Sequence, residues 1–138
     1  MSSPVTVIFA CIHNAGRSQM SAAMFELLAD PEKAVAISAG TNPGTKVHPE
    51  VVIAMQELGL DLSDRQPRKL TDDLAKGAAL LVTMGCGEAC PHVPGLQHLD
   101  WPLTDPKGKS VEEVREIRDQ VKGLVTQLVQ EKGWGKNN

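Results

Sequence analysis

The amino-acid sequence predicts a single α/β domain built on a four-stranded parallel sheet with helices on both faces. Short apolar runs rich in β-branched residues alternate along the chain with segments of helical period, as in repeated strand–helix–strand units. The runs are continuously apolar, which is typical of strands buried on both faces. At 138 residues the chain is long enough for one well-cored domain and too short for two ordinary ones. We therefore expect residues 1–138 to form one domain.

Four segments are expected to form the strands. The first is "VTVIFA" at 5–10, and the second is "AVAISAG" at 34–40, which breaks at its final glycine. The third is "AALLVTM" at 78–84. The fourth, "LQHLD" at 96–100, is shorter and less apolar than the others. Connections between parallel strands run through helices, so this order predicts crossovers over the faces of the sheet.

The first two helices are expected between these strands. One follows the loop after residue 10, and "DP" at 30–31 ends it because the residue before a proline disfavours helix. The other opens at His48-Pro49, with the proline at its first position. Its apolar stripe runs as far as Gly59, which is expected to stop it.

The last two helices carry caps in the sequence. A short helix is expected over 70–77 with Thr71 as its N-cap. Ser110 and Glu113 have the spacing of a capping box, which predicts the start of the final helix. The residues of helical period that follow are Val111, Val114, Ile117, Val121, Leu124, Val125 and Leu128. The tail "GWGKNN" at 133–138 is expected to be frayed, and this last helix to be scaffold.

Composition excludes several classes of function. A net charge of -3 and a pI near 5.8 give no reason to expect nucleic acid or an anionic membrane as partner. No apolar run approaches the roughly 20 residues of a membrane span, and the N-terminus lacks the pattern of a signal peptide. We expect a cytoplasmic protein, whose three cysteines are then reactive or metal-binding thiols more often than a structural disulfide.

The segment "CIHNAGRS" at 11–18 carries the main chemical signal. It joins the first strand to the first helix, and such a loop turns backbone N–H groups and the positive end of the helix dipole toward an anion. Cys11 falls at the carboxyl end of the strand, where open α/β sheets bind ligands. The planar fork of Arg17 suits a tetrahedral oxyanion. The same surroundings stabilise a thiolate, so the loop would both bind the oxyanion and attack its central atom.

Neighbouring residues fit this interpretation to different degrees. Ser18 is placed to donate a hydrogen bond to the thiolate, and Asn14 tolerates the left-handed backbone that a tight loop needs. His13 is as consistent with packing or solvent exposure as with function. In the alternative interpretation Cys11 is an inert core residue and Arg17 caps a surface turn. The substrate is expected to contact Ile12, His13, Asn14, Ala15, Gly16, Arg17 and Ser18.

The loop resembles the phosphate loop of the low-molecular-weight protein tyrosine phosphatase superfamily, and its ending "RSQM" is similar to the arsenate reductase branch. The resemblance extends over nearly the whole chain, through "ISAGT" at 37–41, "VTMGCGEAC" at 82–90 and "LTDPKGKS" at 103–110. It implies a low-molecular-weight phosphatase-like fold. It also implies that Asp105 is the general acid; the alternative is a turn residue ahead of the last helix.

The residues after Asp105 separate a phosphatase from a reductase. Phosphatases of this superfamily carry tyrosines there, whereas this chain has Lys107, Gly108 and Lys109 and contains no tyrosine. A pocket for a phosphotyrosine ring is therefore hard to build. Arsenate matches phosphate in shape and charge, but arsenic(V) can accept two electrons. Two further thiols, Cys86 and Cys90, could supply them by forming a disulfide.

The resemblance and the number of thiols imply a three-step relay. Cys11 attacks arsenate while Asp105 protonates the departing oxygen. Cys86 then attacks the sulfur of Cys11 and releases arsenite, and Cys90 takes over the disulfide. Gly85 and Gly87 flank Cys86, so we expect residues 85–98 to be mobile and to rearrange on oxidation. Thioredoxin is the expected reductant, and no metal or other cofactor is expected.

Other interpretations remain open at this point. Cys86 and Cys90 could bind zinc with His92 or His98, or could be idle thiols beside glycine turns. A small thiol such as mycothiol, or glutathione with glutaredoxin, could replace thioredoxin. The potassium site of some thioredoxin-coupled members uses an acidic residue where this chain has Ala22. The rival functions are a phosphatase of small phosphoesters and a thiol-based sensor of arsenite or metal.

Overall fold

The four predicted strands form one parallel sheet. The structure, a computed structural model, describes residues 4–84 and 95–136. Its strands are β1 (Val5–Cys11), β2 (Ala34–Gly40), β3 (Leu80–Thr83) and β4 (Gln97–Asp100). They are hydrogen-bonded in the order β2-β1-β3-β4, and every neighbouring pair is parallel. The predicted fold class is confirmed, and the strand ends differ from the predicted ones by at most two residues.

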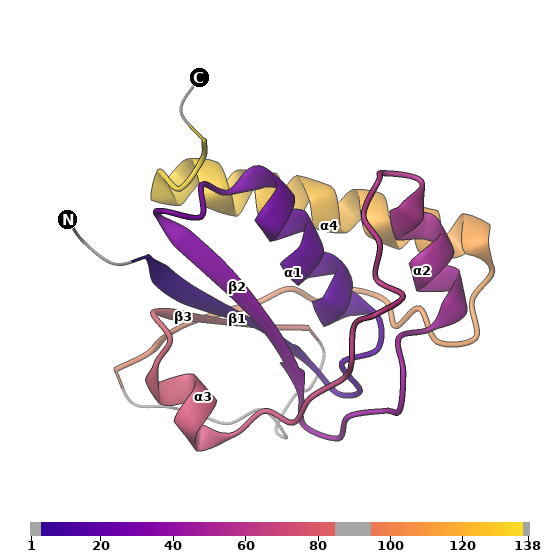
Figure 1. The fold of residues 1–138 in the computed structure, drawn as a ribbon, viewed down its shortest axis with the longest axis horizontal. Coiled ribbons are helices and arrows are strands. Elements are labelled where there is room, and N and C mark those ends of the chain that lie inside the picture. The colour runs from indigo at the N-terminus through magenta and orange to yellow at the C-terminus, as the bar shows by residue number, and fades with distance from the viewer. Residues whose placement is uncertain (1–3, 85–94, 137–138) are drawn as a thin grey trace.

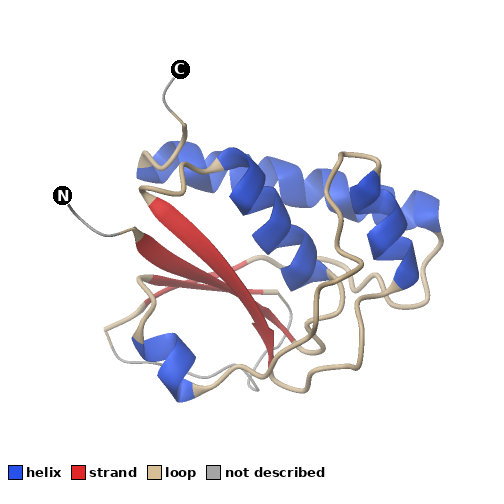
Figure 2. Cartoon of the chain, in the orientation of Figure 1, coloured by secondary structure: helices blue, strands red, loops and turns tan. Residues whose placement is uncertain are grey.

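Helices cover both faces of the sheet, as predicted, but unequally. The long helices α1 (Arg17–Leu28) and α4 (Val111–Lys132) and the shorter α2 (Pro49–Gln56) lie together on one face, while α3 (Asp72–Lys76) lies on the other (Figure 1). Figure 2 shows the three helices of the first face stacked above the strands. Among the residues described, no helix combines the length and the apolar character needed to cross a membrane.

The two faces of the sheet bury separate cores because side chains alternate along each strand. Phe9 lies at the centre of the larger core, with its ring 5.6 Å from that of Phe25 and 5.8 Å from that of Trp101. Ile8 and Leu81 point to the opposite face, toward α3. Each such side chain contributes about 1.5–3 kcal/mol when fully buried. The central strand β1 is therefore fixed from both faces, and its end is a rigid base for the loop that follows.

The predicted caps are present. The hydroxyl of Thr71 accepts a hydrogen bond from the amide of Leu74 at 3.2 Å. Ser110 and Glu113 form the full capping box at the start of α4. The expectation that the second helix runs to residue 59 needs a correction, because α2 ends at Gln56. The chain stays turned up to Gly59, where φ reaches +79° and the direction of the chain changes.

The expectation of a frayed C-terminal tail is wrong for residues 133–136. Gly133 ends α4 in the left-handed conformation, with φ at 71°, and turns the chain back toward α1. The indole ring of Trp134 then packs 6.0 Å from the ring of Phe25. The carbonyl of Trp134 accepts a hydrogen bond from the amide of Asp30 at 2.8 Å. The buried aromatic surface holds the tail against α1.

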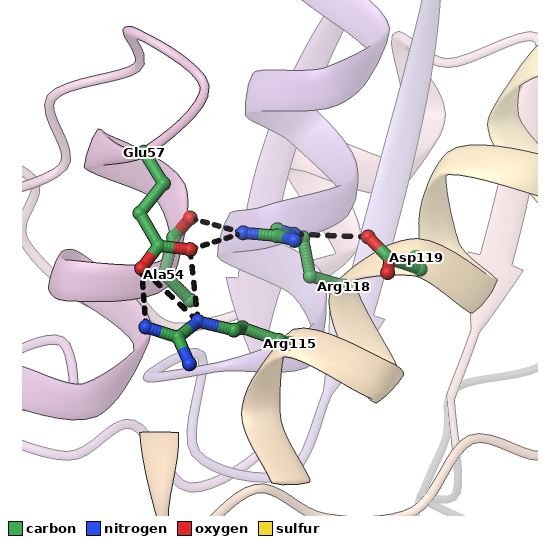
Figure 3. A network of polar contacts seen from close by, with 5 residues as sticks. All are labelled: Ala54, Glu57, Arg115, Arg118 and Asp119. Atoms are coloured by element: carbon green, nitrogen blue, oxygen red, sulfur yellow. Dashed lines mark hydrogen bonds and ion pairs between the residues drawn. The ribbon is translucent and has the colours of Figure 1, made fainter. Parts of the chain in front are cut away.

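An ion-pair network joins the end of α2 to α4 (Figure 3). Glu57 accepts three hydrogen bonds from the guanidinium of Arg115, the shortest at 2.6 Å, and one from Arg118 at 2.7 Å. Arg118 also donates to the carbonyl of Ala54 at 2.8 Å and contacts Asp119 at 3.1 Å. The hydrogen bonds from the two arginines lower the pKa of Glu57 from 4.5 to about 2.

The substitution Glu57→Gln should lower the melting temperature at neutral pH. Because the folded-state pKa of Glu57 is depressed, its ion pairs stabilise the fold above pH 4.5, and this contribution is lost as the pH falls toward 2. Thermal unfolding followed by circular dichroism at several pH values measures the effect. The difference from wild type should shrink as the pH falls through this window. Glu116→Gln, which changes an exposed carboxylate of α4, is the matched control and should change little at any pH.

Candidate active site

The loop of residues 12–16 joins the buried end of β1 to the start of α1. β1 ends at Cys11, which is 2% exposed, and α1 begins at Arg17. In the sheet, β2 lies on one side of β1 and β3 lies on the other, so the strand order reverses direction at β1. Ligands of open α/β sheets bind at such a switch point, outside the carboxyl ends of the strands.

The backbone of this loop is anchored by its carbonyls and leaves its amides unpaired. Within the part of the chain that the structure describes, the amides of residues 12–18 donate no hydrogen bond. The carbonyls of the loop instead accept bonds of 2.8–3.2 Å from the segment that follows β2. These bonds run from Thr41 to Cys11, from Asn42 to Ile12, from Gly44 to His13 and from His48 to Ala15. Unpaired amides around a helix N-terminus form an anion-binding site.

Cys11 is held in a buried chain of hydrogen bonds. Its Sγ lies 2.9 Å from Oγ of Ser18, and that oxygen accepts a 2.7 Å bond from Nδ2 of Asn14. Asn14 has φ of 52°, the one positive value at a residue other than glycine among those described. The predicted contact between Ser18 and Cys11 and the predicted left-handed conformation of Asn14 are both confirmed. The thiol therefore has a fixed polar partner on the helix side of the loop.

Two residues that sequence reasoning missed hold Asn14 in place. Nε2 of Gln19 donates to the backbone carbonyl of Asn14 at 3.1 Å and to its side-chain Oδ1 at 3.2 Å. The amide of Arg68 donates to the same Oδ1 at 2.9 Å. Gln19 is 1% exposed, so a polar side chain lies on the buried side of α1. Burial is a property of the fold, so the sequence alone identifies neither Gln19 nor Arg68 as a partner of the loop.

Two glycines permit close approach of the backbone around the loop. A Cβ at Gly40, at the end of β2, would lie 2.6 Å from the carbonyl oxygen of Ile12 and 2.9 Å from the amide nitrogen of Asn14. A Cβ at Gly16 would lie 2.5 Å from Cγ of Pro106. Non-bonded contacts of a Cβ atom are essentially never this short. A side chain at either position would therefore displace the loop or the segment around residue 105.

Arg17 and Asp105 meet on the solvent side of the loop. The guanidinium of Arg17 is almost buried, and its Nη1 donates to the carbonyl of Leu103 at 3.2 Å. Its Nη2 lies 3.7 Å from Oδ2 of Asp105, whose carboxylate is 44% exposed. Oδ1 of Asp105 accepts a 3.0 Å bond from the amide of Lys107, which closes a turn. The fold thus brings the predicted clamp and the predicted acid together.

Two histidines border the same region. Nδ1 of His13 lies 3.1 Å from the carbonyl oxygen of Asn42, so its ring is tied to the segment after β2. His48, which the sequence marked only as the start of a helix, anchors the loop through its amide. Burial lowers the pKa of His48 below 6.5, against the opposing effect of the Asp105 carboxylate. Burial of His48 therefore favours its uncharged imidazole form.

The predicted redox pair lies outside the described residues. Cys86 and Cys90, with His92 and most of the segment expected to be mobile, fall within 85–94. His98 belongs to β4, where its Nε2 lies 3.0 Å from the hydroxyl oxygen of Thr83. Residues 4–84 and 95–136 contain no group of three histidine, cysteine or acidic side chains placed to hold a metal ion.

The fold and this loop define a class of protein: an α/β domain with a cysteine–arginine anion loop at the carboxyl end of its first strand. The family model described as low molecular weight phosphotyrosine protein phosphatase matches residues 6–134. The chain belongs to this family. The match spans the sheet, the loop and α4, so the predicted resemblance is confirmed over nearly the whole chain.

Several relatives are named as arsenate reductases. A putative arsenate reductase of Halobacterium salinarum is 42% identical over 127 residues, which cover 89% of each chain. A glutaredoxin arsenate reductase of Synechocystis is 33% identical and covers 89% of this chain and 95% of its own. A solved thioredoxin-dependent arsenate reductase of Corynebacterium glutamicum superposes with a TM-score of 0.79 at 37% identity. It covers 95% of this chain, which spans only 63% of that longer one.

Proposed function

We propose that this protein reduces arsenate to arsenite. The observation that carries the proposal is that the amides of residues 12–18, around the buried thiol of Cys11, have no partner among the residues that the structure describes. A tetrahedral oxyanion bound by those amides would present its central atom to the sulfur. Relatives named as arsenate reductases, at 42% and 33% identity, support arsenate as the oxyanion.

The first step is nucleophilic. The thiolate of Cys11 attacks arsenic, one arsenate oxygen departs as water after taking a proton from Asp105, and a covalent Cys11–arsenate adduct remains. Arg17 neutralises charge on the oxygens that stay. The contact of Arg17 with Asp105, at 3.7 Å, supports this arrangement because the acid and the clamp lie at the same side of the loop.

The second step moves two electrons. Cys86 attacks the sulfur of Cys11, and the sulfur–arsenic bonding pair passes to arsenic, which leaves as arsenite. Arsenic is reduced from the +5 to the +3 state, and two thiols are oxidised to the Cys11–Cys86 disulfide. Cys90 then attacks Cys86, which frees Cys11 for another cycle and leaves a Cys86–Cys90 disulfide. This assignment follows from the three thiols of the chain.

Thioredoxin is the proposed reductant of that last disulfide. The relay ends in a disulfide within the protein, which a reductant with two thiols can reduce by thiol–disulfide exchange. One similar solved structure is named as thioredoxin-dependent. Another relative is named for glutaredoxin, so a glutathione system is the alternative, as is mycothiol. The cytoplasm, where thiols are kept reduced, is the compartment in which this cycle would turn over.

Arsenate-dependent NADPH consumption with thioredoxin and thioredoxin reductase tests the relay. Wild type should turn over. Cys86→Ser should lose turnover because the Cys11–Cys86 disulfide cannot form, and Cys90→Ser should lose steady-state turnover because that disulfide cannot be passed on to thioredoxin. Activity with glutaredoxin or a small thiol that survives Cys90→Ser would contradict the role of the second pair. The same assay with thioredoxin omitted is the control for direct oxidation of NADPH.

A phosphatase of small phosphoesters is the second candidate. Cys11, Arg17 and Asp105 are also the residues that phosphoester cleavage through a cysteinyl phosphate would need, and the family carries that activity in its name. In this case Cys86→Ser should keep full turnover on an aryl phosphate, and arsenate should act only as an inhibitor. Loss of arsenate reduction in Cys86→Ser, together with slow hydrolysis of aryl phosphate by wild type, would exclude it.

A further inference from the structure

Gln19 makes an unusual pair of hydrogen bonds beside the loop. Its side chain is buried, and its Nε2 contacts both the backbone carbonyl and Oδ1 of Asn14, at 3.1 and 3.2 Å. Its own Oε1 is buried and, among the residues described, has no hydrogen-bond partner. Buried acceptors without partners are rare because losing water costs free energy. The contacts with Asn14 therefore determine the position of the Gln19 side chain, and its Oε1 is left without a hydrogen bond from the described residues.

The contacts of Oδ1 fix which way the Asn14 amide faces. Oδ1 accepts from Gln19 and from the amide of Arg68, at 3.2 and 2.9 Å, so the NH2 group is the end that faces Ser18. An amide orientation is read from its hydrogen-bond partners, and two donors on one atom define it here. Nδ2 of Asn14 then donates to the hydroxyl oxygen of Ser18 at 2.7 Å.

This orientation decides the direction of the last hydrogen bond. Because the oxygen of Ser18 already accepts from Asn14, its own proton is directed to the remaining neighbour, Sγ of Cys11 at 2.9 Å. A sulfur that accepts this bond is stabilised as the thiolate. With the Asn14 amide reversed, its oxygen would accept the proton of Ser18, and the hydroxyl oxygen could then accept only from a protonated thiol.

We propose that Gln19 is a positioning residue that holds the Asn14 amide in the orientation that makes Ser18 a donor to Cys11. Gln19 touches neither the thiol nor the oxyanion and acts through two intervening side chains. This inference deepens the proposed function, because it assumes that Cys11 reacts as a thiolate. Gln19 and Gln66 both line a hollow of about 350 Å³ between β2, α1 and residues 64–68. Gln66 makes no hydrogen bond to the loop and provides a matched control.

The pH dependence of Cys11 alkylation tests the inference. All variants carry Cys86→Ser and Cys90→Ser, so that Cys11 is the only thiol. In the parent, the rate of reaction with iodoacetamide rises with pH to a plateau as the thiol ionises, and this profile is the reference. Gln19→Met keeps the length of the side chain but removes the donor. Its profile should shift to higher pH, with a rate at pH 6 about three- to tenfold below the parent. Gln66→Met should follow the parent.

A second variant and the melting temperatures separate an effect on the alkylation profile from a loss of folding. Gln19→Glu keeps the shape of the side chain but sets a carboxylate oxygen against two acceptor oxygens of Asn14, so the alkylation profile should shift at least as far as in Gln19→Met. Melting temperatures are measured on the same samples. A lower melting temperature with an unmoved profile in both variants would overturn the inference and leave the proposed nucleophile intact. A parent profile like that of a free cysteine, without protection by phosphate, would overturn both.

Discussion

Cys11→Ser is expected to abolish arsenate reduction while the loop still binds oxyanions. A serine hydroxyl stays protonated at neutral pH and cannot close to a disulfide, so no electron pair reaches arsenic. Removing a nucleophile that forms a covalent intermediate lowers kcat by about 10⁴-fold or more. The binding groups are separate from the sulfur. The amides of residues 12–18 and the guanidinium of Arg17 stay in place, because the carbonyls of the loop are tied to the segment after β2.

Two measurements on Cys11→Ser separate chemistry from binding. Turnover is followed by arsenate-dependent NADPH consumption, and the dissociation constant of inorganic phosphate is measured by calorimetry. The expected result is loss of turnover with phosphate affinity within a few-fold of wild type. Thr126→Ala, which removes a hydroxyl of α4 that donates to the carbonyl of Lys122, is the control. Arsenate turnover above a hundredth of the wild-type rate would contradict the proposed role of Cys11.

The core of the candidate site could be predicted because it is local in the chain. Cys11 at the end of a strand and Arg17 at the start of a helix are joined by five residues. Chain connectivity alone therefore places the thiol and the guanidinium on one compact loop. Two further predicted features are equally local in the chain. Asn14 has a left-handed backbone with φ of 52°, and Oγ of Ser18 lies 2.9 Å from Sγ of Cys11.

The supporting groups depend on contacts that are distant in the chain. The amide of Arg68, in the segment after α2, donates to the side chain of Asn14. The carbonyl of Leu103 accepts from Arg17, which is 86 residues away in the sequence. No periodicity in a single sequence encodes these approaches. The contact of His48 with the loop could not be predicted either, because a histidine before a proline is a common start of a helix. The burial that lowers its pKa exists only once the loop is in place.

The C-terminal tail shows the same limitation for the fold. A short segment of glycine, lysine and asparagine has little reason to be ordered by itself, and this composition favoured fraying. Trp134 overrides that tendency because its indole finds an aromatic partner, Phe25, at 6.0 Å on α1. Amphipathic helices and apolar strands reveal their buried faces in sequence, whereas a single aromatic residue in a polar tail reveals neither its partner nor its burial.

Asp105→Asn should slow arsenate reduction about 10²–10⁴-fold, which is the usual cost of losing a general acid. Asparagine keeps an oxygen that can accept the 3.0 Å bond from the amide of Lys107, so the turn should survive. What disappears is a carboxyl group 3.7 Å from Arg17 that supplies a proton in its protonated form and carries a negative charge in its ionised form. Without that charge a dianionic substrate is repelled less, and the KM for arsenate should stay level or fall while kcat drops.

Asp119→Asn is the matched control for this substitution. Asp119 is also an exposed carboxylate that contacts an arginine, at 3.1 Å from Nε of Arg118, but it lies on α4 within the network shown in Figure 3. Its loss should leave both kcat and KM at wild-type values. Steady-state kinetics on the two variants distinguish a proton donor from a charge that only shapes the site. A decrease in kcat of less than tenfold in Asp105→Asn, or a rise in KM alone, would mean that another group protonates the departing oxygen.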